Sequence, residues 1–126
     1  MEKRIITSLN APAPIGPYSQ AVLVNGTLYC SGQIAINPGT GELVMDNIEQ
    51  ETVQAMKNIQ EVLKAADMDL SHVVKTSIFL SDMNLFQQVN AVYGAYFQND
   101  FPARETVAVK TLPKNVNVEI SVIAVK

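Results

Sequence analysis

The chain has 126 residues, of which 48% are hydrophobic and 17% charged, and its formal net charge at pH 7 is −3. This composition excludes a disordered chain, and the length suits one domain spanning residues 1–126. The acidic balance, the lack of a Lys/Arg run and the lack of a long apolar segment predict a cytoplasmic protein that uses neither nucleic acid nor a membrane as partner.

The first predicted element is a β-hairpin. In the stretch AVLVNGTLYCSG, residues 21–32, two apolar runs flank Asn25-Gly26, a dipeptide typical of two-residue hairpin turns. Cys30, the only cysteine, lies in the second run and is expected to be a buried thiol rather than a reactive one. The flanking stretches APAPIGP and NPGTGE are typical of loops.

Two amphipathic helices follow. The first is predicted over Ile48–Ala66, with Asp46 or Asn47 as its N-cap. Its apolar positions recur at helical spacing: Val53, Met56, Ile59, Leu63 and Ala66. The second opens at Ser81 or Asp82 and ends before Phe101-Pro102. Its apolar positions are Leu85, Phe86, Val89, Val92, Tyr93, Tyr96 and Phe97.

Three further strands complete the predicted order ββ(β)αβαββ. Val73–Leu80 is rich in β-formers, with Val74, Thr76, Ile78 and Leu80 expected on one face. Arg104–Lys110 and Asn117–Val125 are joined through TLPKN, and a hairpin there would place Glu119 opposite Ala108. Two helices with one apolar stripe each cannot cover both sheet faces, so an α+β fold with both helices on one face is expected.

The other face of the sheet should bind another subunit. In the last strand, Val118, Ile120, Val122 and Ala124 form the helix-facing set. The alternate set includes Ile123 and Val125, which are too apolar to be left to water and predict a homo-oligomer packed through this face.

The strand after the second helix carries Arg104 beside two small residues. Assigning Val107 and Val109 to the core places Arg104 on the same side of the sheet as Glu119, several residues away along the strand. A ligand site that used both groups would be easier to build where two subunits meet.

Several segments together resemble the reactive intermediate deaminase family (RidA, YjgF type). They are APAPIGPYSQAV, SGQIAINPGTGELV, VKTSIFLSDMNLFQQVNAVY, FPAR and LPKNVNVEISVIAV, and they span nearly the whole chain in the family's order and spacing. The resemblance implies a chorismate-mutase-like fold and a homotrimer with clefts between subunits. It also implies hydrolysis of enamine and imine intermediates such as 2-iminobutanoate and 2-iminopropanoate, without a cofactor, to 2-keto acids and ammonia.

Matched position by position, the resemblance implies a set of site residues. Glu119, Tyr18 and Ser31 would be catalytic, and Arg104, Gly32, Asn90 and Thr106 would bind the substrate. Thr106 stands where many members have cysteine, so thiol chemistry is not expected at that position. The first helix ends in Ala66-Asp67 where members usually have Ala-Gly, which affects local stability only.

Residue chemistry agrees with these roles but leaves alternatives open. A guanidinium can bind a carboxylate in bidentate fashion, yet Arg104 could equally pair with Glu105. Glu119 could relay a proton for attacking water, or lie on a solvated strand edge. Tyr18 could be loop packing, Ser31-Gly32 a strand bulge, and Asn90 a solvated helix residue.

Other chemistries are disfavoured. His72 is the only histidine and has no companions at ligand spacing, so no metal site is predicted. Two alternative functions remain: a ribonuclease or translation inhibitor, which the acidic charge opposes, and a non-catalytic module that binds small carboxylates to regulate a partner.

Overall fold

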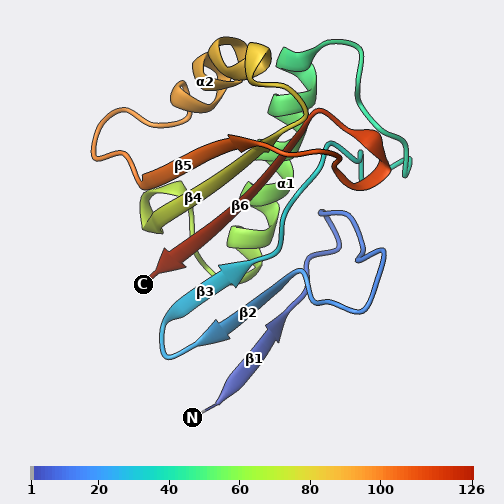
Figure 1. The fold of residues 1–126 in the computed structure, drawn as a ribbon. Helices are drawn as coiled ribbons and strands as arrows, with labels where there is room; N and C mark the ends of the chain where they lie inside the picture. Colours follow the sequence, from blue (N-terminus) through green and yellow to red (C-terminus); the bar gives the residue numbers. More distant parts are fainter. Residues whose placement is uncertain (1) are drawn as a thin grey trace.

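The computed structural model describes residues 2–126 and has an α+β fold (Figure 1). One mixed sheet has the strand order β1-β2-β3-β6-β4-β5. The strands are β1 (Lys3–Ile6), β2 (Ala21–Val24), β3 (Thr27–Cys30), β4 (Val73–Leu80), β5 (Ala103–Ala108) and β6 (Val118–Val125). The helices α1 (Ile48–Ala65) and α2 (Phe86–Gly94) lie on one face of this sheet, as the sequence predicted (Figure 1).

The locally encoded elements agree with prediction. Asn25 and Gly26 join β2 to β3 with φ of 49° and 80°, the left-handed pair that a type I′ turn requires. The side chain of Asn47 accepts a hydrogen bond from the Gln50 backbone N–H (2.8 Å) and caps α1. The second helix begins with a short 3₁₀ turn at Met83–Leu85, capped by Asp82, before α2 proper.

The core lies between the sheet and the two helices. Met56, Ile59 and Leu63 of α1 are fully or almost fully buried against Val118, Ile120 and other residues of β6. Each such side chain removes enough apolar area from water to stabilise the fold by about 1.5–3 kcal/mol. The alternation along β6 is as predicted, because Val118, Ile120, Val122 and Ala124 are all buried.

Of the four residues predicted to share one face of β4, Val74 was placed wrongly. The pairing of β4 with β6 shifts between Val73 and Lys75, which leaves Val74 as the extra residue of a bulge, 49% exposed. Val73 takes the buried position in its place. A bulge inserts one residue into the alternation, so a strict two-residue period misassigns everything before it.

The predicted hairpin between the last two strands was also wrong. β5 pairs in parallel with β4, and β4 lies between β5 and β6. The unit β4-α2-β5 is thus a crossover connection, which brings a strand back parallel to its predecessor. Glu119 lies opposite Phe79 of β4 rather than opposite Ala108.

The face of the sheet away from the helices, called here the open face, carries exposed apolar side chains. Ile5, Tyr29, Val107 and Val125 on this face are each more than 40% exposed. Part of the face is covered by a second small cluster beside the segment between β5 and β6. Its buried members are Ile34, Ile36, Leu112 and Val116, and Phe79 and Val109 pack against it.

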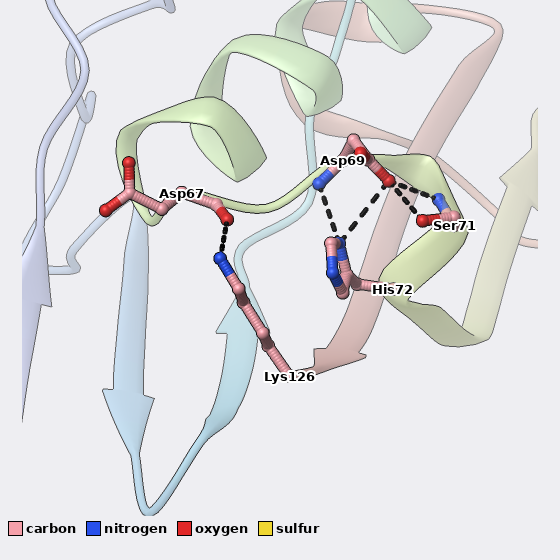
Figure 2. Close-up of polar contacts among 5 residues, drawn as sticks. All are labelled: Asp67, Asp69, Ser71, His72 and Lys126. Carbon is pink, nitrogen blue, oxygen red and sulfur yellow. Dashed lines mark hydrogen bonds and ion pairs between the residues drawn. The ribbon is translucent and has the colours of Figure 1, made fainter.

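The end of α1 and the C-terminus are tied together. Asp67 adopts the left-handed conformation (φ 57°) after α1, and its carbonyl accepts a hydrogen bond from Lys126 Nζ (2.7 Å; Figure 2). An Asp therefore occupies the position where Gly is most favourable. No helix within residues 2–126 combines the length and apolarity needed to cross a membrane.

Candidate functional site

A cavity of ≈ 300 Å³ lies at the end of the open face, called here the acid cavity. Its walls come from the loop before β2, the segment after β3, and β6. The lining residues include Pro12, Tyr18, Ser31, Gly32, Pro113 and Glu119. Four predicted residues are thus brought together: Tyr18, Ser31, Gly32 and Glu119.

The loop wall of the acid cavity is held by a buried amide. Gln20, 2% exposed, accepts a hydrogen bond from the Ser8 N–H (2.6 Å) and donates Nε2 to the carbonyls of Ser8 (3.1 Å) and Pro12 (2.9 Å). A Gln that hydrogen-bonds several backbone groups can hold an irregular loop in place, because such a loop lacks the regular backbone hydrogen bonds of a helix or sheet. The role of Gln20 was not predicted, because a glutamine after a loop gives no signal of burial.

Gly32 allows the carboxyl group of Glu119 to lie over the backbone. A Cβ atom at position 32 would come within 2.7 Å of Glu119 Cδ, a distance that real Cβ atoms do not adopt. Burial raises the pKa of the Glu119 carboxyl above its ordinary value. This carboxylate is therefore poised to accept a proton more readily than a solvated one.

The two hydroxyl groups in the acid cavity have defined partners. Ser31 Oγ donates to the Ser19 carbonyl (2.6 Å), so its lone pairs remain for a ligand donor. Tyr18 Oη accepts from the Ile15 N–H (3.2 Å), so its proton remains for a ligand acceptor. Tyr18 is 46% exposed and reaches the cavity rim.

A second cavity of ≈ 440 Å³ lies beside α2 and is called here the arginine cavity. Its lining residues are Asn90, Tyr93, Gly94, Phe101, Pro102 and Arg104. Arg104 Nη1 donates to Asn90 Oδ1 (2.7 Å), and the guanidinium lies over the rings of Phe86 and Tyr93. Asn90 is thus an exposed helix residue that is bonded to the arginine.

Arg104 does not pair with Glu105, the alternative left open by the sequence. Glu105 points to the opposite face, where it accepts a hydrogen bond from Ser77 Oγ and pairs with Lys75 (2.9 Å), and these contacts lower its pKa. Within residues 2–126 no carboxylate lies at ion-pairing distance from Arg104. The charge of the guanidinium is therefore free to meet an anionic ligand.

Thr106 follows Arg104 on the same face of β5. The two residues lie beside Thr76 and Ile78 of β4, both buried under the helices. Thr106 Oγ1 is buried and has no hydrogen-bond partner within residues 2–126. A buried hydroxyl without a partner is costly and calls for a ligand or another chain to satisfy it.

The expectation that Arg104 shares a sheet face with Glu119 was wrong. Arg104 faces α2, whereas Glu119 faces the open side with Phe79. Val107 and Val109 misled the assignment because both lie on the open face, where Val107 is exposed and Val109 packs against the second cluster. Six of the seven predicted residues therefore divide between two cavities on opposite faces of the sheet, and Thr106 lines neither cavity.

The only histidine lies apart from both cavities. His72 Nδ1 accepts from the Asp69 N–H (3.0 Å) in the turn before β4, and Asp69 in turn accepts from Ser71 (Figure 2). The hydrogen bonds from Ser71 lower the pKa of Asp69. No group of three or more His, Cys, Asp or Glu side chains in residues 2–126 could hold a metal ion.

Known proteins resemble this chain over nearly its whole length. The family model described as Endoribonuclease L-PSP matches residues 8–126. A 2-iminobutanoate/2-iminopropanoate deaminase of Homo sapiens is 48% identical over 124 residues, which cover 98% of this chain and 90% of that protein. A Lactococcus lactis protein provisionally named regulator AldR is 53% identical over 121 residues, 96% of each chain. Among solved structures, a Rid-family protein of Yersinia pestis superposes with a TM-score of 0.96 at 52% identity, covering 99% of this chain and 100% of that one.

Proposed function

Because this chain belongs to the Endoribonuclease L-PSP family, which includes similar proteins named as deaminases, we propose that it hydrolyses 2-imino acids to 2-keto acids and ammonia. The observation that carries the proposal is that a cation lines the arginine cavity and a carboxyl group lines the acid cavity. Arg104 is a cation that has no acidic partner among residues 2–126, and Glu119 is a carboxyl whose pKa is raised by burial. A 2-imino acid needs both, a cation for its carboxylate and a base for the attacking water.

The two cavities form one active site when subunits assemble as a homotrimer. Within one chain the sheet itself separates Arg104 from Glu119. The exposed apolar residues of the open face, including Ile5, Tyr29 and Val125, favour a contact through that face. Each cleft then combines the arginine cavity of one subunit with the acid cavity of its neighbour.

The reaction proceeds by addition of water to a protonated imine. Arg104 binds the substrate carboxylate in bidentate fashion, while Ser31 Oγ accepts a hydrogen bond from the iminium N–H. The Glu119 carboxylate takes a proton from water as its oxygen attacks C2, which gives a tetrahedral carbinolamine. Glu119 then returns the proton to the amine, the C–N bond breaks and ammonia leaves. As it leaves, the C2 hydroxyl gives its proton to the Glu119 carboxylate and becomes the keto oxygen, and Glu119 passes this proton to the ammonia.

The remaining site residues assist these steps. The Tyr18 hydroxyl donates to the attacking water or to the carbinolamine oxygen, and Gly32 allows Glu119 to occupy its place. Asn90 orients Arg104. Thr106 donates its hydroxyl, which has no partner in the described part of the chain, to the bound carboxylate. No metal or cofactor is required, because a protonated imine is already electrophilic.

A coupled assay tests the proposal. A pyridoxal-phosphate threonine dehydratase is mixed with threonine, so that it releases 2-iminobutanoate, and 2-oxobutanoate is followed with and without this protein. The protein should accelerate appearance of the keto acid, and Glu119→Gln, which keeps the shape but not the base, should not. Equal rates with wild type, variant and no protein would overturn the deaminase.

A second candidate is a regulatory module that binds small carboxylates without turnover. The name of the Lactococcus lactis relative favours this function. The same two cavities would then bind 2-oxobutanoate without accelerating its formation. Calorimetric titration with 2-oxobutanoate, done beside the coupled assay, separates the two functions.

A further inference from the structure

Arg104 is held by two aromatic rings in addition to Asn90. Its Cζ atom lies 5.7 Å from the centroid of the Phe86 ring and 5.3 Å from that of Tyr93. Phe86 is the first residue of α2 and Tyr93 lies near its end, so one helix supplies both rings and Asn90 as well. A guanidinium within about 6 Å of an aromatic face is attracted by the ring quadrupole.

The rings stabilise the cation without using its hydrogen-bond donors. A guanidinium has five N–H donors in its plane, whereas an aromatic ring contacts the face of that plane. Within residues 2–126 the guanidinium makes one hydrogen bond, to Asn90. An acidic partner would occupy the same donors that a ligand carboxylate needs, so aromatic support leaves them free for the ligand.

Tyr93 is itself fixed in place. Its ring is 3% exposed and packs against Phe97 with ring centroids 5.0 Å apart. Its hydroxyl donates to Thr76 Oγ1 (2.9 Å) on β4, and Thr76 is the register partner of Arg104. These contacts therefore link helix α2, strand β4 and strand β5 beside the Arg104 side chain.

We propose that Phe86 and Tyr93 are positioning residues that hold the Arg104 guanidinium in one orientation and thereby set how tightly the site binds a carboxylate. The identity of the ligand as a 2-imino acid rests on the proposed function. The held orientation itself can be measured without any turnover. Neither ring needs to touch the substrate.

The kinetic test uses Phe86→Leu with Phe97→Leu as matched control. Phe97 packs on Tyr93 but does not contact the guanidinium, and the hydrogen bond from Tyr93 to Thr76 still holds the Tyr93 ring when Phe97 is replaced, so this replacement removes aromatic packing alone. Phe86→Leu should raise KM for the 2-imino acid about three- to tenfold with kcat within about twofold. The reason is that the lost interaction stabilises the bound substrate and the transition state equally. Phe97→Leu should leave KM unchanged.

A double-mutant cycle with Arg104→Gln shows whether the ring acts through the cation. In the Arg104→Gln background, Phe86→Leu should cause no further loss of kcat/KM, since no cation remains to be positioned. Additive losses, or an equal rise in KM for Phe97→Leu, would overturn the proposal and leave both rings with a packing role.

The spectroscopic test does not depend on activity. In ¹⁵N-labelled protein the Arg104 Nε–H proton, assigned by its loss in Arg104→Gln, should resonate upfield because of the two ring currents. Phe86→Leu should move it toward the ordinary arginine position, and Phe97→Leu should not. An ordinary shift in the wild type would refute the held guanidinium, whereas a shifted signal in a protein without deaminase activity would refute the proposed function alone.

Discussion

At the scale of single residues, the contact between Gly32 and Glu119 is the most sensitive feature of the acid cavity. Gly32→Ala would place a Cβ atom within 3 Å of the Glu119 side chain, which must then move away. Because proton transfer needs hydrogen-bond reach, deaminase activity should fall at least about tenfold, while the melting temperature changes by only a few degrees. Gly39→Ala, in an exposed turn, is the control and should keep full activity. An active Gly32→Ala enzyme would mean that Glu119 is not the base.

The raised pKa of Glu119 predicts a pH dependence of stability. The folded state holds the proton of this carboxyl more tightly than the unfolded state, so stability is full below the ordinary pKa and is lost as pH rises through the folded pKa. Glu119→Gln removes this loss of stability at higher pH, because the glutamine side chain does not ionise. The variant should melt at a higher temperature than wild type at pH 7, and the difference should vanish near pH 4. A variant less stable than wild type at pH 7 would show that a cation or donor stabilises the carboxylate.

At the scale of secondary-structure elements, α1 is tied to β6 by a buried carboxylate. Glu51, fully buried in the first turn of α1, accepts hydrogen bonds from Asn117 N (2.7 Å), Asn117 Nδ2 (2.9 Å) and Val118 N (3.1 Å). This contact fixes the start of the strand that carries Glu119. Glu51 lies where the periodic pattern of α1 marks only a polar residue, so that pattern does not predict a buried carboxylate.

Removal of the Glu51 carboxylate should therefore weaken the whole fold. Glu51→Ala leaves three N–H groups without an acceptor and should cost about 3 kcal/mol or more of unfolding free energy. Glu51→Gln should cost less, because one side-chain oxygen can still accept. Glu49→Ala, in the same turn but exposed, should stay within about 0.5 kcal/mol of wild type. Urea unfolding checks all three, and equal midpoints for Glu51→Ala and Glu49→Ala would contradict the role.

At the scale of the whole molecule, the decisive feature is that the sheet separates the two halves of the proposed site. If neighbouring subunits complete each site, two variants that are strongly impaired for different reasons should restore each other's activity. Arg104→Gln and Glu119→Gln trimers, mixed under conditions that allow subunit exchange, should regain roughly a quarter of wild-type activity, because each mixed ring has one intact cleft. No recovery despite proven exchange would place the site within one chain. Each variant alone, taken through the same exchange, is the control.

What the sequence alone determined were the features encoded by near neighbours. The Asn25-Gly26 turn, the Asn47 cap and the helical spacing of α1 each depend on a few adjacent residues whose backbone preferences are strong. The family resemblance added the site residues, including Arg104 and Glu119, which no pattern of spacing could have joined.

Tertiary structure alone decided which strands are neighbours and which way their side chains point. A valine is equally suited to either face of a sheet that has apolar contacts on both sides, so Val107 and Val109 could not reveal that Arg104 faces α2. The bulge at Val74 shifted the alternation by one residue, and the crossover through α2 put β4 between β5 and β6. These outcomes depend on free energies summed over contacts between segments distant in sequence, which is why local patterns do not contain them.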